Sequence, residues 1–160
     1  MDTYESIQRL AEFSSEIRKI TLERLQEVPE GFFNWRLNNT AMSFGHILKH
    51  LIEVDELFFS LGTSKENQFQ WELGSEQPNI DLTKHTYETK ILELKKNLKK
   101  RYTAICILDD FGMNKEVADK NGKKMSFWWF IMRNVLEHEI YHTGQIAAYL
   151  KVLKGESSEI

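Results

Sequence analysis

Apolar residues recur at intervals of three and four along four stretches of the chain, which is the spacing of an amphipathic helix. These stretches cover about residues 2–27, 40–61, 81–107 and 126–155. Residues suited to capping stand at the start of the last three stretches: Thr40 or Ser43, Asp81 or Thr83, and Ser126. No segment has the strict alternation of a half-buried strand over a useful length. The pattern therefore predicts an all-α four-helix bundle, which we expect to form a single domain over residues 1–160.

The apolar stripes of these helices predict the core. On the first helix we expect the following residues to face inward: Ile7, Leu10, Ala11, Phe13, Ile17, Ile20, Leu22 and Leu25. On the third helix the stripe is Tyr87, Ile91, Leu94, Leu98, Tyr102 and Ile105. The third helix also has a basic side, which mixed acidic residues mark as solvent-exposed: Lys84, Lys90, Lys95, Lys96, Lys99, Lys100 and Arg101.

Two connections are long enough to affect the topology. Residues 63–80 are polar and contain Gly74 and Pro78, so we expect a long crossover between the second and third helices. This crossover permits an arrangement other than simple up-down-up-down. Residues 109–125 form a second connection, in which Lys120-Asn121-Gly122-Lys123 is a turn signal for a small hairpin.

Composition excludes several classes of function. The net charge of −3 gives no overall positive field for binding nucleic acid or an anionic membrane. A single cysteine rules out an internal disulfide and is compatible with a reducing compartment. The first residues lack the pattern of a signal peptide, and no apolar run has the roughly 18–20 residues needed to span a bilayer. We therefore expect a soluble cytoplasmic protein.

Histidines stand on the apolar faces of the second and fourth helices. His138 and His142 are four residues apart, so their side chains share the face that carries Ile131, Val135 and Ile146. On the second helix, His50 lies about 60° from the centre of the apolar arc. A polar ring in an apolar seam needs a partner, because leaving it unpaired costs about 1–3 kcal/mol. A carbonyl or a buried water would serve as well as a metal ion.

Three neutral imidazoles from facing helices suit Zn²⁺, Ni²⁺ or Fe²⁺ and leave coordination positions open, as catalytic sites do. A carboxylate such as Glu53, Glu137 or Glu139 could orient one of the rings. His46 falls near the border of the apolar arc, where it could be a fourth ligand or stand next to the site. A fourth histidine would close the coordination sphere and favour a binding site over a catalytic one.

Two other metal motifs fit poorly. His138-Glu139-Ile140-Tyr141-His142 matches the metalloprotease pattern His-Glu-x-x-His, but that pattern needs a third ligand downstream, and the 18 residues after His142 contain no histidine and lie mostly in the same helix. Glu139-x-x-His142 matches half of a di-iron carboxylate signature, but the first and third helices do not offer a second copy. Both alternatives are therefore disfavoured.

The segments around these histidines resemble a known family. His138-Glu139-x-x-His142-Thr143-Gly144-Gln145-Ile146 and Gly45-His46-Ile47-Leu48-Lys49-His50-Leu51 are similar to the fourth and second helices of the DinB/YfiT-like superfamily. The resemblance implies a metal triad of His50, His138 and His142. It also implies a four-helix bundle with a long connection between the second and third helices, often as a dimer. Related proteins include transferases that use bacillithiol or mycothiol, and proteins called metal-dependent hydrolases.

The resemblance and the residues together predict a function. We expect a divalent metal ion, zinc or nickel before iron, that activates a small-molecule thiol for transfer to an electrophile, or water for hydrolysis. Glu53 or Glu139 is a candidate base, and Trp128 and Arg133 are candidates for contacting the substrate. We expect a homodimer and no nucleic-acid or membrane partner. The alternative is a non-catalytic metal-binding or stress-response dimer.

Overall fold

The computed structural model describes residues 2–63, 81–119 and 121–155, and it confirms the all-α helical bundle. Three of the four predicted helices appear within a few residues of the expected bounds: α1 (Thr3–Gln26), α2 (Phe44–Thr63) and α3 (Lys84–Cys106). The fourth is a continuous helical run in three parts: α5 (Phe127–Phe130), the π-helix η1 (Ile131–Glu137) and α6 (His138–Lys154).

The helix ends follow from local chemistry. The Asp2 carboxylate accepts a hydrogen bond from the backbone N–H of Glu5 at 2.7 Å, which caps the start of α1. Ser126 accepts in the same way from Trp129 and begins the last helical run where the sequence predicted it. Gly155 ends that run with a φ of 71°, a left-handed conformation that glycine adopts without a steric penalty.

The connection before the last run contains more structure than expected. A short helix, α4 (Asp110–Asn114), occupies a segment predicted as irregular. The predicted hairpin is present as β1 (Glu116–Ala118) and β2 (Lys124–Ser126), an antiparallel pair in which Val117 faces Met125. Lys120, in the predicted turn, lies outside the described residues, as does the predicted loop segment 64–80.

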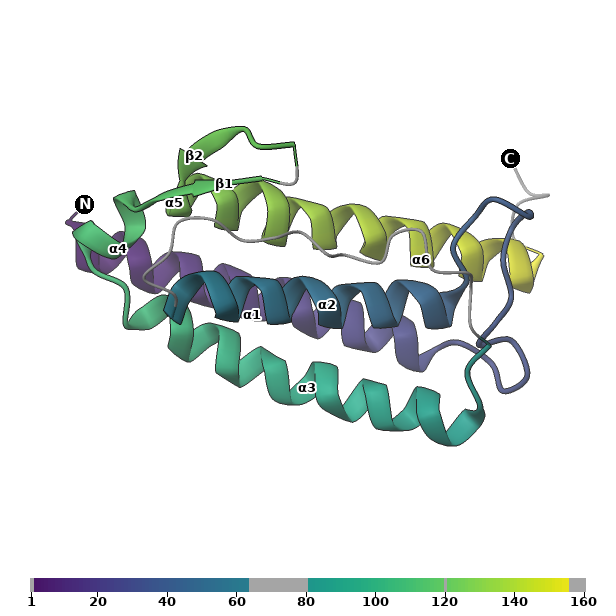
Figure 1. Cartoon of the computed structure of the whole chain (residues 1–160). Coiled ribbons are helices and arrows are strands. Elements are labelled where there is room, and N and C mark those ends of the chain that lie inside the picture. The colour runs from purple at the N-terminus through teal and green to yellow at the C-terminus, as the bar shows by residue number, and fades with distance from the viewer. Residues whose placement is uncertain (1, 64–80, 120, 156–160) are drawn as a thin grey trace.

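The order of the helices in space gives the bundle its topology (Figure 1). α1 and the α5–α6 run point in one direction, and α2 and α3 both point in the other. α2 ends and α3 begins at opposite ends of the bundle, which is the arrangement that the predicted crossover requires. α6 packs chiefly on α1, whereas α2 packs chiefly on α3. In the three described ranges, every helix is too short or too polar to cross a membrane.

The core consists of two apolar clusters along the length of the bundle. One cluster includes Leu10, Phe58 and Phe130, and the other includes Leu25, Phe44 and Ile146. Two residues of the predicted α1 stripe are not in either cluster. Phe13 and Ile20 keep 44% and 48% of their surface exposed, because they stand at the outer border of the stripe. Ile20 lines the groove between α1 and α6.

A layer of buried charge lies in the interior at the level between the two clusters. It has one residue from each long helix, Arg18 on α1, Asp55 on α2, Arg101 on α3 and Glu139 on α6, and we call these four residues the charged layer. All four are at most 1% exposed. Arg101 was predicted on the solvated face of the third helix, and that prediction was wrong. Arg101 is buried because its two acidic partners, Asp55 and Glu139, lie inside the bundle.

The charged layer is internally neutral and densely hydrogen-bonded. Arg18 binds both Asp55 and Glu139, at 2.8 Å to the nearest oxygen of each. Arg101 also binds both carboxylates, at 3.3 and 2.6 Å, and binds the Ser14 hydroxyl at 2.7 Å. Such pairing is what makes burial of these charges tolerable, because an isolated ion would be strongly disfavoured in the core.

Candidate metal centre

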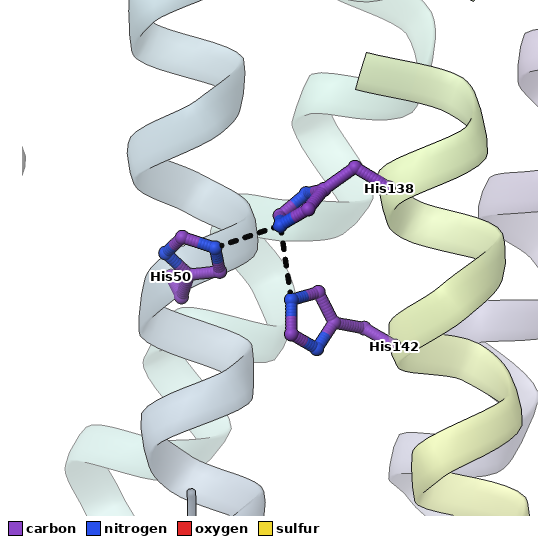
Figure 2. Close-up of side chains that lie close together, drawn as sticks. All are labelled: His50, His138 and His142. Carbon is purple, nitrogen blue, oxygen red and sulfur yellow. Dashed lines mark hydrogen bonds between the residues drawn. The ribbon is translucent and has the colours of Figure 1, made fainter. Parts of the chain in front are cut away.

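Three imidazoles converge between α2 and α6. His50 comes from the seventh residue of α2, and His138 and His142 come from the first and fifth residues of α6. The Nε2 atom of His138 lies 3.0 Å from Nε2 of His50 and 3.1 Å from Nε2 of His142. The rings point their nitrogens at one another across the gap between the two helices (Figure 2). The structure therefore brings together the three predicted ligands.

The donor set fits a divalent cation. One ligand nitrogen from each histidine lies within 4.8 Å of the other two. In a tetrahedral zinc site with Zn–N bonds of about 2.0–2.1 Å, neighbouring nitrogens are about 3.3 Å apart. The two distances from Nε2 of His138, 3.0 and 3.1 Å, are close to this spacing. A single Nε2 has either one proton or one lone pair, so His138 cannot make good hydrogen bonds to both neighbours through that atom. A cation among the rings would accept all three lone pairs, and the cluster is compatible with metal binding.

A chain of hydrogen bonds orients His142. Its Nδ1 lies 2.9 Å from Oε1 of Gln145, and Nε2 of Gln145 donates to the Tyr149 hydroxyl at 2.9 Å. The amide oxygen accepts the Nδ1 proton, which leaves the lone pair on Nε2, the atom that faces the other rings. Burial lowers the pKa of His142, while the Gln145 hydrogen bond and the Glu139 charge oppose this shift. The ring is therefore neutral at pH 7, the form that binds metals.

Removing the Gln145 amide should weaken metal binding without unfolding the protein. We expect Gln145→Ala to lower the affinity for Zn²⁺ by about 10–100-fold, because the ring of His142 loses the partner that fixes its tautomer. Isothermal titration with Zn²⁺ measures the change. Gln145→Glu, which keeps an acceptor at the same place, is the matched control and should retain most of the affinity. Equal affinities of Gln145→Ala and wild type would contradict the orienting role.

The other α2 candidates stand beside the three rings. His46 is not a member of the group of three among the described residues, although it is near enough to His142 for an electrostatic effect that lowers the pKa of that ring. Glu53 is half-buried, with Oε2 4.0 Å from Nδ1 of His50 and Oε1 3.6 Å from the Lys49 ammonium. That distance to His50 is too long for a hydrogen bond, so Glu53 influences the ring through its charge.

Glu139 has a different environment from the one expected of a base. Burial alone would raise the pKa of its carboxyl, but the charges of Arg101 and Arg18 and their hydrogen bonds outweigh burial and hold the pKa at about 2. A carboxylate of such low basicity takes up a proton poorly at neutral pH. We therefore assign Glu139 to the charged layer and do not retain it as a candidate base.

This low pKa predicts how stability depends on pH. The folded-state pKa lies below the ordinary value of 4.5, so Glu139 stabilises the fold above that value and the contribution is lost as pH falls toward about 2. We expect the urea midpoint to decrease steeply across this window. Unfolding followed by circular dichroism between pH 6 and pH 2 tests the prediction. The control is Glu27→Gln, which removes an exposed carboxylate paired with Lys154 and should show nearly the same decrease of the urea midpoint between pH 6 and pH 2 as the wild type. A wild-type midpoint that stays constant over this pH range would contradict the prediction.

Comparison with known proteins places the chain in a family. The sequence profile of the DinB family matches residues 2–157. The chain belongs to the DinB family. Its structure is similar to the crystal structure of YjoA, a DinB-like protein from Bacillus subtilis, with a TM-score of 0.66 at 18% sequence identity. The similarity covers 91% of this chain and 92% of YjoA, and at this identity it supports the shared fold alone. A comparison with curated proteins found no match.

In this DinB-family chain the two residues predicted to contact a substrate lie elsewhere. Trp128 lines a small cavity of about 240 Å³ with Asp110 and Met113, and none of the three histidines lines that cavity. Arg133 is exposed, forms an ion pair with Glu137 at 3.0 Å and lies over the ring of Trp129 at 5.8 Å. Its guanidinium is therefore engaged at the surface, and the described geometry gives neither residue a contact with the three rings.

The roles of Gln145 and of the charged layer were not predicted from the sequence. Gln145 follows His142 by three residues, a spacing at which side chains on a helix meet, so the hydrogen bond could have been expected. Arg18 follows Ile17 and precedes Leu22, which places it beside the apolar stripe of α1, and Asp55 occupies the equivalent place beside Val54. A charged residue beside an apolar stripe is a signal from which buried charge could have been expected, although it does not identify the partner.

Proposed function

We propose that this DinB-family protein is a divalent-metal enzyme that transfers a low-molecular-weight thiol to an electrophile, with hydrolysis as the second possible reaction. The observation that carries the proposal is the meeting of three Nε2 atoms, with His138 at 3.0 and 3.1 Å from its two neighbours. Zinc and nickel suit three neutral nitrogens best, and iron is possible. The preference for thiol transfer rests on the family resemblance.

The chain supplies a prepared ligand set. His50, His138 and His142 would hold the cation, and when bound it would lower the pKa of a thiol or water in contact with it. Gln145 keeps the proton of His142 on Nδ1, and burial keeps that ring neutral at pH 7. Glu139, the residue next to His138, is held by four side-chain hydrogen bonds, which come from Arg18, Arg101 and Thr21.

A small substrate would approach from the side of His50. The His50 side chain keeps 20% of its surface exposed, whereas His142 is buried. Glu53 stands on this more open side, with 28% of its side chain exposed and no arginine holding it. In this proposal Glu53 is the proton acceptor for the incoming thiol or water, because its carboxylate is accessible and is not committed to a buried ion pair.

Elemental analysis and a conjugation assay together test the proposal. The purified protein should contain close to stoichiometric zinc or nickel, and it should conjugate bacillithiol, mycothiol or glutathione to monochlorobimane. For the replacement of any one of the three histidines, His85→Ala is the matched control, because His85 is exposed on α3 and outside the cluster. Glu53→Gln should lower turnover while the metal stays bound.

Two outcomes would change the conclusion. Protein that contains metal but turns over no thiol and hydrolyses no test ester or amide would favour the second candidate, a non-catalytic metal-binding or stress-response protein. Protein that takes up neither zinc nor nickel nor iron would overturn the proposal. The homodimer and the cytoplasmic location stay predictions, for which sedimentation equilibrium and cell fractionation are the measurements.

A further inference from the structure

The two helices that carry the histidines are not each other's main packing partners. α6 packs chiefly on α1, and α2 packs chiefly on α3. The distance between His50 on α2 and the pair on α6 must therefore be set through other elements. Ring nitrogens 3.0 and 3.1 Å apart tolerate little error in that spacing, since a displacement of about 1 Å spoils a site of this kind.

One side chain of α1 connects these two helices directly. The Arg18 guanidinium donates from Nη1 and Nη2 to the two oxygens of Asp55 on α2, at 2.9 and 2.8 Å. It also donates from Nε and Nη2 to the two oxygens of Glu139 on α6, at 2.8 and 3.0 Å. Both edges of the guanidinium that can form paired hydrogen bonds with a carboxylate are thus occupied. Because the guanidinium is rigid, it holds the two carboxylates in a fixed relation.

The carboxylates that Arg18 joins are close to the histidines in the chain. Glu139 follows His138 directly, so it projects about 100° from His138 and about 60° from His142 around the axis of α6. Asp55 follows His50 by five residues on α2, about 7.5 Å further along the helix. Holding Glu139 toward Arg18 therefore also fixes the rotation of α6, which turns both of its histidines toward α2.

Additional contacts keep Arg18 itself in place. Its Nη1 donates to the Leu94 carbonyl on α3 at 3.1 Å, and the side chain is fully buried. Arg101 bridges the same two carboxylates from α3. Glu139 and Asp55 raise the pKa of Arg18 despite its burial, so the group stays charged. The link from Asp55 through Arg18 to Glu139 is therefore rigid, because it contains neither a flexible ammonium group nor an exposed side chain.

We infer that Arg18 is a positioning residue for the metal centre: its two-edged contact with Asp55 and Glu139 sets the spacing and rotation of α2 and α6 at which the three imidazoles meet. This inference rests on the proposed metal binding. A role in stability alone is the competing explanation, and buried ion pairs often contribute little to stability compared with apolar replacements. The two explanations differ in what happens to the metal site when the fold survives.

The test compares Arg18→Lys with a core variant of the same helix. Lysine keeps the positive charge but cannot form two bidentate contacts. We expect Arg18→Lys to bind Zn²⁺ about 10–100-fold more weakly in competition with a chromophoric chelator. The absorption bands of bound Co²⁺, which report ligand geometry, should also shift. Leu25→Ala removes buried volume from α1 in the second apolar cluster, and its Zn²⁺ affinity should stay within about twofold of wild type.

A second variant covers the case in which Arg18→Lys does not fold. Replacing the whole charged layer with apolar residues, as Arg18→Met, Asp55→Leu, Arg101→Met and Glu139→Leu, removes every buried charge together and should leave a folded bundle. Its Zn²⁺ affinity should fall at least as far as that of Arg18→Lys. Folding is verified by circular dichroism under the assay conditions.

The outcomes separate the inference from the proposed function. If the wild type binds Zn²⁺ and a folded Arg18→Lys or apolar-layer variant binds it equally well, with the same Co²⁺ spectrum, the positioning role is wrong and the metal site stands. If Leu25→Ala loses affinity as much as Arg18→Lys does, general destabilisation explains the effect and the inference is again wrong. If the wild type binds no metal, the proposed function fails, and the inference fails with it.

Discussion

Replacing Glu139 by leucine is expected to lower the free energy of unfolding at pH 7 by about 3–5 kcal/mol. The substitution removes the carboxylate that both Arg18 and Arg101 bind, and it leaves the charged layer with two cations and one anion in the core. It also removes one acceptor of the Thr21 hydroxyl, Oε1 of Glu139 at 2.8 Å. Urea unfolding followed by circular dichroism measures the loss.

Glu137→Leu is the matched control for this prediction. Glu137 stands two residues earlier in the same helical run and is also paired with an arginine, but its side chain is 57% exposed. Exposed ion pairs contribute about 0–1 kcal/mol, so the control should change the unfolding free energy by no more than that. Similar losses of unfolding free energy in the two variants would mean that the buried charged layer contributes no more to stability than an exposed ion pair.

Replacing His138 by alanine should remove most of the affinity for a divalent ion. His138 is the central ring of the cluster, because its Nε2 is the atom that approaches both His50 and His142. Loss of a direct ligand should exceed the roughly 10–100-fold effect of losing an orienting partner, so we expect at least about a 100-fold decrease. At a Zn²⁺ concentration of about 100 times the wild-type Kd, bound metal stabilises the fold by about 2.7 kcal/mol, and the variant should lose most of this gain.

Thermal unfolding with and without Zn²⁺ measures this second effect. The melting temperature of the wild type should rise on adding the metal, whereas that of His138→Ala should hardly move. His85→Ala, on the exposed side of α3, should respond as the wild type does. A His138→Ala protein that is stabilised by Zn²⁺ to the full extent would show that the ion binds somewhere else.

The helices and the three histidines could be predicted because their signals are local. Pro29 and Gly31 follow α1, Gly155 ends α6, and the spacing of four between His138 and His142 places both rings on one face. His50 was found because the apolar arc of its own helix gives its direction. Each of these inferences needs only the residues within a few turns of one helix.

The charged layer depends on partners that no local pattern identifies. Arg18 and Glu139 are separated by 121 positions, and Arg101 and Asp55 by 46. Periodicity places Arg101 at the edge of a stripe, but only the packing of four helices brings two acids within reach of it. Glu139 illustrates the same limit, because its neighbours in the chain suggested a base and its neighbours in space make it a structural anion.

The π-helix η1 also escaped prediction, and it affects how this chain should be aligned with its relatives. Each of its turns contains one residue more than an α-helical turn, so the aromatic start of the run and the histidine face are out of phase by about one residue, or about 100°. A homologue whose last helix is α-helical throughout should therefore show a one-residue gap between Ser126 and His138. An ungapped alignment across that segment would pair either the histidines or the preceding aromatic residues correctly. The other set would be shifted by one position.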